Sequence, residues 1–387
     1  MAREIPIPGF MFWPVGTGDS ITVGIEEEVV MQVDLHNLEC ADNEDDPHVS
    51  IVDELVESLP KKNGKPYLSL FVLTHPDKDH CCGFAELLEE VTIGEIWLTP
   101  RVFREYQCDL SDDAKAFKEE AERRIDVTIS EGSLPDAGDR IRIFGYDDEE
   151  GFEDFPRDLI TGPGHTVTVV DGLDYEGAFA AFVHAPFKDD CAGERNDTSL
   201  ALQITLTSDT ATGRALLFGD LCYPTIRKIF DITEEDQYLE WNVFLAPHHC
   251  SKSVMYWADD PEDEKELKQD ILDDIETAMG SPGYIVASCE PIPTSNKSGD
   301  NPPHAKAKSR YEELVDSGNF LCTQEHPNQT APSPIVFRLG ESELEYVAPA
   351  DEKSQKSEDR SASVLSAAVA AARGATEPPK DRVGFGR

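Results

Sequence analysis

The stretch Thr74-His75-Pro76-Asp77-Lys78-Asp79-His80 is the part of the sequence that decides its interpretation. It holds two imidazoles and two carboxylates within six residues, between an apolar run typical of a buried strand and a predicted helix start. Imidazole and carboxylate groups are the usual ligands of borderline and hard divalent metals. A turn of this kind can direct all four side chains at one centre, so the stretch predicts a metal site at a strand end.

Three further apolar runs also end in residues that can bind a metal. They are Val29 to Val33 before Asp34, Arg214 to Phe218 before Gly219-Asp220, and Val243 to Ala246 before Pro247-His248-His249. An isolated ionised carboxylate at the end of a buried strand is costly unless it is paired or bound to a metal. Adding Asp220 and His248 to the first stretch therefore predicts one metal centre, with one or two ions.

The remaining patterns predict an α/β architecture. More apolar runs are expected to form strands at Tyr67 to Thr74, Asp126 to Ser130, Arg140 to Phe144, Ser199 to Leu206 and Tyr284 to Ser288. Helices are expected at Gly83 to Glu90, at Ser111 to Arg124, and from Asp260-Pro261 to Met279, the last two being acidic and interpreted as insertions. Mixed strands and helices with polar residues at strand ends predict layers with the site at one sheet edge.

Composition limits the possible classes of protein. The 387 residues contain 34 Lys and Arg against 77 Asp and Glu, a net charge of −43, and 39% hydrophobic residues, which is enough to form a core. This charge argues against a broad phosphate-binding face. Nine scattered cysteines form neither a disulfide framework nor paired zinc spacings. No apolar run reaches the roughly 18 residues of a membrane span.

The charge and the composition change near the end of the sequence. From Asp351 onward there are seven basic and six acidic residues, a net charge of +1, which leaves −44 on the preceding part. We expect one folded domain at 1–348 and a disordered Ser/Ala/Pro-rich tail at 349–387. The first 20 residues lack the pattern of a secretory signal, so a cytoplasmic location without membrane contact is expected.

The metal-binding stretch resembles a loop of the metallo-β-lactamase superfamily, most closely that of the soluble hydrolase domain of ComEC-like DNA-uptake proteins. The usual HxHxDH is HxDxDH here, and the ComEC-like branch makes the same replacement at the position of Asp77. Further elements match this branch in order: Val15 to Ser20, Val33-Asp34, Asn196 to Leu200, Leu217 to Asp220, Pro247 to Ser251, Asn301 to His304 and Gly318 to Leu321. The resemblance covers about Phe10 to Leu339.

Two departures from the family pattern concern glycines. Cys81-Cys82-Gly83 replaces an apolar-Gly-Gly element, and Cys250 replaces the glycine that usually follows the second histidine. Glycine is used where backbone and ligand come close, so both changes are expected to narrow the approach of a substrate. Small buried thiols are the expected role of these cysteines, with a redox or inhibitory-metal role as the alternative.

The resemblance implies an αββα sandwich of two mixed sheets flanked by helices. It also implies a metal centre with Asp220 as the bridging carboxylate and with the ligands His75, Asp77, Asp79, His80, Asp220 and His248. The family's third-motif histidine has no clear counterpart: His165 and His184 are candidates, and His165 is not expected to bind. An oxygen-rich first position favours Mn²⁺ or Mg²⁺, while Zn²⁺ remains an alternative.

The implied reaction is phosphodiester hydrolysis by metal-activated hydroxide, as in a stand-alone nuclease. In this scheme Asp79 orients the hydroxide, and His249 or His304 protonates the leaving oxygen. A purely structural alternative for His249 is a hydrogen bond that fixes His248. Phosphate oxygens are expected to contact Asn196, Ser199, Ser251 and Lys252.

The negative charge restricts how a nucleic acid or nucleotide substrate is held. Local groups must bind it, and the segment His304 to Arg310 is either a basic rim for this purpose or the start of an exposed helix. One competing function is a catalytically quiet module whose acidic insertions or tail bind a protein partner. Another is an acyl, thioester or cyclic-nucleotide hydrolase.

Overall fold

Two mixed β-sheets form from the apolar runs in the computed structural model, which describes residues 3–43, 46–104, 110–131, 135–146, 151–188, 196–260, 262–296 and 301–349. The first sheet has the strand order β22-β21-β1-β2-β3-β6-β7-β8-β9, with β5 paired to β6. Its strands are β1 (Gly9–Phe12), β2 (Ile21–Glu26), β3 (Val29–Val33), β5 (Lys61–Lys62), β6 (Lys65–Val72), β7 (Thr92–Leu98), β8 (Arg140–Phe144), β9 (Ile160–Thr161), β21 (Ile335–Leu339) and β22 (Leu344–Tyr346). Strands β3, β6, β7, β8 and β9 are parallel to one another.

The second sheet has the order β10-β13-β14-β15-β16-β19-β20. Its strands are β10 (Thr166–Val167), β13 (Phe179–Ala185), β14 (Ala201–Thr207), β15 (Thr212–Leu217), β16 (Trp241–Leu245), β19 (Met279–Ala287) and β20 (Phe320–Cys322). The run from β15 to β20 is parallel. Smaller strands are β4 (Leu35–His36) and the pairs β11 (Val169–Val170) with β12 (Leu173–Asp174) and β17 (Tyr256–Trp257) with β18 (Glu266–Leu267).

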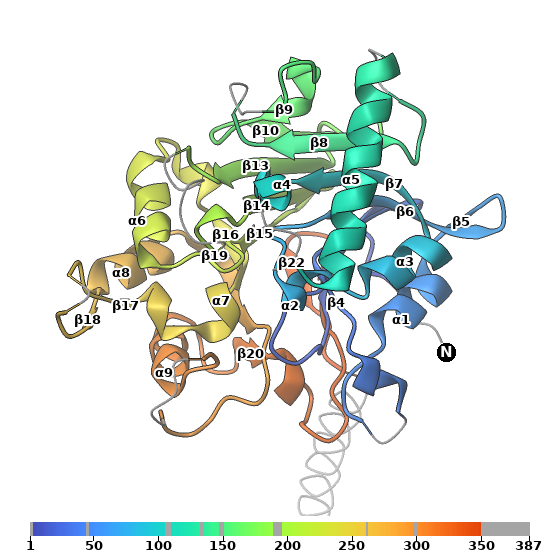
Figure 1. The fold of residues 1–387 in the computed structure, drawn as a ribbon. Coiled ribbons are helices and arrows are strands. Elements are labelled where there is room, and N and C mark those ends of the chain that lie inside the picture. Colours follow the sequence, from blue (N-terminus) through green and yellow to red (C-terminus); the bar gives the residue numbers. More distant parts are fainter. Residues whose placement is uncertain are drawn as a thin grey trace, which may run out of the picture. The chain divides into compact units, whose positions relative to one another are not determined.

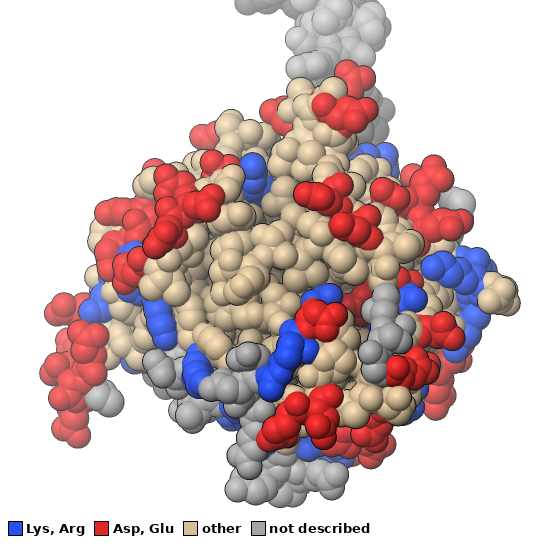
Figure 2. Space-filling model, turned by 90° about the horizontal axis from the view of Figure 1, so that it is seen from above, with Lys and Arg blue, Asp and Glu red and all other residues tan. Residues whose placement is uncertain are grey.

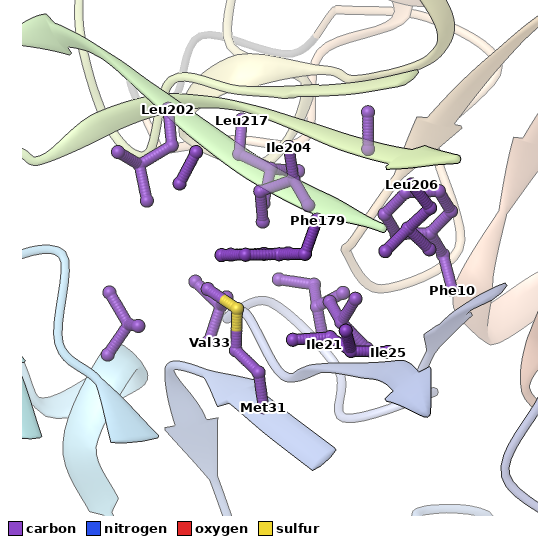
Figure 3. Packing of buried hydrophobic residues seen from close by; sticks show 14 of the residues in the cluster. Phe10, Ile21, Ile25, Met31, Val33, Phe179, Leu202, Ile204, Leu206 and Leu217 are labelled. Atoms are coloured by element: carbon purple, nitrogen blue, oxygen red, sulfur yellow. The ribbon is translucent and has the colours of Figure 1, made fainter. Parts of the chain in front are cut away.

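The main core lies between the two sheets. Successive side chains of a strand point to opposite faces, so every second residue of β2 and β3 enters this core: Ile21, Val23, Ile25, Val29, Met31 and Val33. Figure 3 shows the ring of Phe179 between two groups of core residues, with Ile21, Ile25, Met31 and Val33 on one side and Leu202, Ile204 and Leu217 on the other. The predicted sandwich of two mixed sheets is confirmed.

Helices cover the outer face of each sheet (Figure 1). On the first sheet, α1 (Ile51–Ser58), α3 (Phe84–Glu90) and α5 (Asp112–Glu131) contribute to one apolar cluster. On the second, α6 (Tyr223–Ile232), α8 (Gln269–Thr277) and α9 (Ala305–Leu314) contribute to another. The short helices are α2 (Lys78–Cys81), α4 (Arg101–Arg104) and α7 (Pro247–Cys250). This is the predicted αββα layer order.

Two secondary-structure predictions were wrong in part. The expected strand at Asp126 to Ser130 is the end of α5, because the buried face of that helix continues through Arg124 and Thr128 at helical spacing. The expected helix from Asp260 to Met279 is only α8, since Glu266–Leu267 pairs as β18 and Met279 begins β19.

The two acidic helices are layers of the fold and not insertions on its surface. Phe117 of α5 packs against Phe71 and Phe84, with ring centroids 5.9 and 4.9 Å apart. In α8, Ile271 and Ile275 are fully buried. Acidic side chains are spread around the outline of the face in Figure 2, so the charge is not confined to one insertion.

The compact unit that carries these layers is Met1–Tyr346. The tail predicted at 349–387 lies, apart from residue 349, outside the described residues, so it stays a prediction. Among the described residues, no helix has the length and apolar character needed to cross a membrane.

Candidate metal centre

The predicted ligands, together with the strand-terminal Asp34, come from loops that follow parallel strands. Asp34 follows β3, the stretch from Thr74 to His80 follows β6, Asp220 follows β15, and His248 follows β16. The carboxyl ends of parallel strands meet at one edge of a sheet, and the two sheets face each other. Figure 1 shows the result, with α2 and α7 at the same end of the sandwich.

Asp34 organises the first loop. Its backbone has φ of +53°, a left-handed conformation that Asp tolerates better than most residues. Its carboxylate accepts hydrogen bonds from Thr74 N (2.8 Å) and Thr74 Oγ1 (2.6 Å). It also lies 2.8 Å from His80 Nδ1, which places the proton of that ring on Nδ1 and leaves Nε2 as the ligand atom.

The ring of His75 is held in a similar way. Its Nδ1 lies 3.1 Å from Thr74 Oγ1 and 3.4 Å from Ser199 Oγ. Ser199 is fully buried, and its hydroxyl donates to Asn196 O (2.9 Å). These contacts let Ser199 position the ring of His75, while the expected contact of Ser199 with phosphate stays a prediction. Its Oγ also accepts from the backbone N–H of Asp220 (3.3 Å).

An unusual backbone presents the last two imidazoles. His248, His249 and Cys250 have φ of +51°, +52° and +64°, three consecutive non-glycine residues in the left-handed region. Each costs on the order of 1–2 kcal/mol in local strain. The conformation turns both histidine rings toward Asp220, and His248 N donates to Gly219 O (3.0 Å).

The two oxygens of Asp220 face different groups of side chains. Oδ2 lies 3.8 Å from His75 Nε2 and 3.7 Å from His248 Nε2, and Asp77 Oδ2 is 3.7 Å from the same atom of His75. We call His75, Asp77, His248 and Asp220 Oδ2 the first ligand set.

The second ligand set is Asp79, His80, His249 and Asp220 Oδ1. Oδ1 of Asp220 lies 3.3 Å from His80 Nε2 and 3.4 Å from His249 Nε2. Asp79 Oδ2 is 3.3 Å from His249 Nε2. Asp220 therefore lies between two sets that each offer two imidazoles and a further carboxylate. The bridging role expected for Asp220 stays a prediction.

Asp19 is a member of this site that the sequence analysis did not assign. It groups with His80, Asp220 and His249, with one ligand atom of each within 4.8 Å of the others. Asp19 Oδ1 is 3.6 Å from His249 Nδ1, and Asp19 N donates to Asp79 O (3.1 Å). The signal was present in the element Val15 to Ser20, which contains this carboxylate.

The ligand atoms have the character expected of a metal site. Nε2 of His75, His80 and His249 and Oδ1 of Asp220 are buried and form no hydrogen bond with described residues. Buried polar atoms without hydrogen-bond partners are costly, and several that converge on one point suit the binding of a cation. The residues therefore fit divalent metal binding.

The electrostatics of the cluster agree with this interpretation. Burial alone raises the pKa of Asp220, but the charges of His249 and His80 outweigh burial and hold that pKa well below its usual range. Burial lowers the pKa of His80, yet Asp220 and Asp34 raise that pKa well above its usual value. Protonated imidazoles thus supply the positive charge that stabilises the carboxylates. A divalent ion can replace the protons on these imidazoles.

Other predicted residues brace the loop after β16. The N–H of Lys252 donates to His304 Nδ1 (3.2 Å), and His304 N donates to Cys250 O (3.2 Å). The Ser251 hydroxyl accepts from Ser253 N (3.3 Å) and Ser253 Oγ (2.9 Å), so it caps a turn. The expected substrate contacts of Lys252 and Asn196, and the proton-donor role of His304, stay predictions.

The two alternative histidines lie elsewhere. His165 is exposed, with Nδ1 3.2 Å from Gly162 O. His184 is buried, and its Nε2 lies 2.9 Å from Tyr238 O. Neither belongs to a ligand set, so the extra imidazoles come from the His248-His249 pair.

The proposed basic rim is part of α9. Ala307 and Tyr311 face the core, so the segment is a helix with a buried face. Lys308 pairs with Glu325 (3.5 Å), and Arg310 pairs with Glu313 (2.7 Å). These carboxylates reduce the positive charge available to a phosphate.

Comparison with known proteins adds a structural likeness only. No family model and no curated protein matches the chain. Among solved structures, it is similar to the metallo-beta-lactamase SMB-1 bound to 2-mercaptoethanesulfonate, at 10% identity and a TM-score of 0.30, over 62% of this chain and 77% of that one. It is also similar to MEM-A1, a subclass B3 metallo-beta-lactamase from a soil metagenome library, at 10% identity and a TM-score of 0.31, over 63% and 78%.

Proposed function

We propose that the chain is a metal-dependent phosphodiester hydrolase that binds two divalent ions, one in each ligand set. The observation that carries this proposal is the position of Asp220, whose two carboxylate oxygens face two separate pairs of imidazoles. Two ions held by these residues would suit a displacement at phosphorus. When bound, the ions lower the pKa of a coordinated water to about 7 and offset negative charge on phosphoryl oxygens.

The side chains that could handle the reacting water and the leaving group lie at or near the ligand sets. The side chain of Asp79 is 36% exposed while that of Asp220 is 4% exposed, so a reacting water can reach Asp79 more easily than Asp220. Asp79 can orient that water by accepting a hydrogen bond from it. His249, by contrast, is 1% exposed at its side chain and lies among ligand atoms, which favours a ligand role over protonation of a leaving group. His304 remains the candidate acid.

We further propose that the substrate is a nucleic acid or nucleotide, held locally, as the ComEC-like resemblance suggests. With a net charge of −43, the protein as a whole repels a polyanion. The backbone N–H of Lys252 donates to His304 Nδ1 beside the ligand loop, and the ammonium group of Lys252 is a candidate for a phosphate contact. Acidic surface away from this edge could serve a basic protein partner.

The metal remains to be identified. Each ligand set offers two nitrogens and two oxygens, which suits Zn²⁺ or Mn²⁺ better than Mg²⁺, an ion that prefers oxygen ligands. The second ligand set is richer in nitrogen than the predicted ligands alone, because His249 is added to it.

An activity panel tests the proposal. Purified protein loaded with Mn²⁺, Zn²⁺ or Mg²⁺ is assayed against single- and double-stranded DNA, RNA, cyclic dinucleotides and bis-p-nitrophenyl phosphate. We expect turnover of at least one phosphodiester, lost in Asp220→Asn and His80→Ala and kept in the control His165→Gln. Wild-type protein that binds two ions yet cleaves none of these substrates contradicts the proposed reaction. Less than one bound ion per chain contradicts the metal centre and favours the interaction module.

A further inference from the structure

A second group of metal-ligating side chains lies outside the metal centre. It consists of Cys40, Asp46 and His48 from the segment between β4 and α1, and each residue offers one ligand atom within 4.8 Å of the others. Glu290, which follows β19, contacts the same histidine. None of these four residues belongs to either ligand set around Asp220.

The thiol and one carboxylate converge on a single nitrogen of His48. Cys40 Sγ lies 3.8 Å from His48 Nδ1, a separation compatible with two ligands on one tetrahedral ion. Asp46 Oδ1 lies 2.6 Å from the same nitrogen and also accepts from the backbone N–H of His48 (2.9 Å). The sulfur, nitrogen and oxygen atoms therefore form one cluster, with all three within 4.8 Å of one another.

The other nitrogen of His48 is held from behind. Its Nε2 lies 3.0 Å from Glu290 Oε1, the arrangement in which a metal-ligating histidine donates its remaining N–H to a carboxylate. Gly16 closes this side, since a Cβ at Gly16 would lie 3.0 Å from both His48 Nε2 and Glu290 Oε1. The ring therefore has a fixed orientation with Nδ1 toward Cys40.

The local field favours a cation. Burial and then the charge of Asp46 raise the pKa of the Cys40 thiol, because two carboxylates stand close to a group that becomes negative on ionisation. The simple alternative is that His48 only pairs with Asp46 and Glu290, without a metal. The Cys40 thiol has no function in that alternative, whereas a metal site uses it as a ligand. Measurements on the thiol therefore distinguish the two interpretations.

We propose that Cys40, Asp46 and His48 bind a Zn²⁺ ion, with Glu290 orienting the imidazole. Binding replaces the thiol proton of Cys40 by a zinc–sulfur bond and releases that proton to solvent, with water in the fourth position. A thiolate with an imidazole selects zinc over Mn²⁺ and Mg²⁺. The ion would tie the segment after β4 to the residues beside Gly16 and Glu290.

Zinc counting and cobalt substitution on the full chain test this site independently of activity. After equilibration with Zn²⁺ and removal of excess, mass spectrometry should find one ion fewer per chain in Cys40→Ser and in His48→Gln than in wild type. The control His165→Gln, which changes an exposed histidine, should keep the wild-type count. Co²⁺-loaded wild type should show a thiolate-to-cobalt charge-transfer band that Cys40→Ser lacks and Asp220→Asn retains.

Two results overturn the proposal. One is an equal zinc count in wild type and Cys40→Ser together with no thiolate band. The other is a band that survives Cys40→Ser but disappears in Cys222→Ser, because Cys222 Sγ lies 3.8 Å from His248 Nδ1 and would then be the thiolate on the catalytic centre. Failure of the phosphodiesterase assay affects neither result.

Discussion

The orientation of each imidazole in the ligand sets depends on the nitrogen that points away from Asp220. Asp34 holds Nδ1 of His80, and Ser288 O, at 3.2 Å, holds Nδ1 of His249. Such partners fix the tautomer and keep Nε2 available as a ligand. At the scale of single residues, the metal centre therefore depends on groups that never touch the metal.

Asp34→Asn tests this dependence. The amide keeps the shape of the side chain but loses the charge that faces His80 Nδ1 and the Thr74 hydroxyl. We expect metal affinity to fall about 10- to 100-fold, the usual effect of removing such a partner. Competition with a fluorescent chelator measures it, with the fully exposed Asp112→Asn as control. Unchanged affinity would mean that Thr74 and packing suffice to orient the ring.

The same residues show what a sequence can and cannot reveal about the site. The residues His75, Asp77, Asp79 and His80 could be recognised because their spacing on one turn is visible in the chain. The ligand position of His249 could not, since it depends on three successive left-handed residues that the sequence gives no reason to expect. A glycine at 250 would have signalled that conformation, but Cys250 stands there.

His184 gives a prediction about pH. Burial lowers its pKa from 6.5 to about 4, so the folded protein keeps it neutral where the unfolded chain binds a proton. The contribution of neutral His184 to the free energy of unfolding is therefore fully present above pH 6.5 and is lost as the pH falls toward 4. At roughly pH 4.5 the loss is about 2.5 kcal/mol. Urea titrations at about pH 7.5 and 4.5 measure how far the free energy of unfolding drops between the two pH values. This drop should be smaller by that amount in His184→Gln than in wild type. The exposed His165→Gln should keep the wild-type difference.

At the scale of elements, the site depends on close contacts between loops of the two sheets. The β1–β2 turn lies against α2, where Asp19 N donates to Asp79 O, and Ser288 Oγ, just after β19, donates to Gly18 O (2.5 Å). Asp220 is supplied by the second sheet. The ligand sets therefore exist only when both sheets pack in their native register.

Gly18→Ala tests the contact of the turn with α2. A Cβ at this position would lie 2.2 Å from His36 Nδ1 and 2.7 Å from Asp79 O, so the turn or α2 must move. We expect a loss of about 1–3 kcal/mol in unfolding free energy and weaker metal binding. Denaturant titration and metal competition measure both effects. Gly162→Ala, whose nearest contact is Gly145 O at 3.3 Å, should change the unfolding free energy much less and leave metal binding unchanged.

Helix α5 provides a test of the outer layer. Phe117 is fully buried against Phe71 and Phe84, whereas Ile129 of the same helix is 39% exposed. Phe117→Ala should reduce the free energy of unfolding by about 3–5 kcal/mol. Ile129→Ala should cost less than about 1 kcal/mol. If both variants lower the free energy of unfolding by the same small amount in urea titrations, α5 is an insertion on the surface and not a layer of the fold.

At the scale of the whole molecule, the net charge of −43 sets the conditions for any polyanionic substrate. Most nucleic-acid-binding proteins lose affinity as salt is added, because phosphate contacts release counterions. Here the basic groups of α9 are partly neutralised by Glu325 and Glu313, and the body repels the substrate. Added salt should therefore screen a repulsion instead of weakening an attraction.

We expect kcat/KM for single-stranded DNA to rise as ionic strength increases toward about 0.15 M, where the Debye length is about 8 Å. The rise should be steeper for long oligonucleotides than for short ones, because a longer polyanion meets more of the protein's field. The small substrate bis-p-nitrophenyl phosphate should show almost no change, and it reports any direct effect of salt on the metal centre. A fall of kcat/KM with salt for the long substrate would show that a basic surface guides it, and Lys306→Ala combined with Lys308→Ala and Arg310→Ala would then locate that surface.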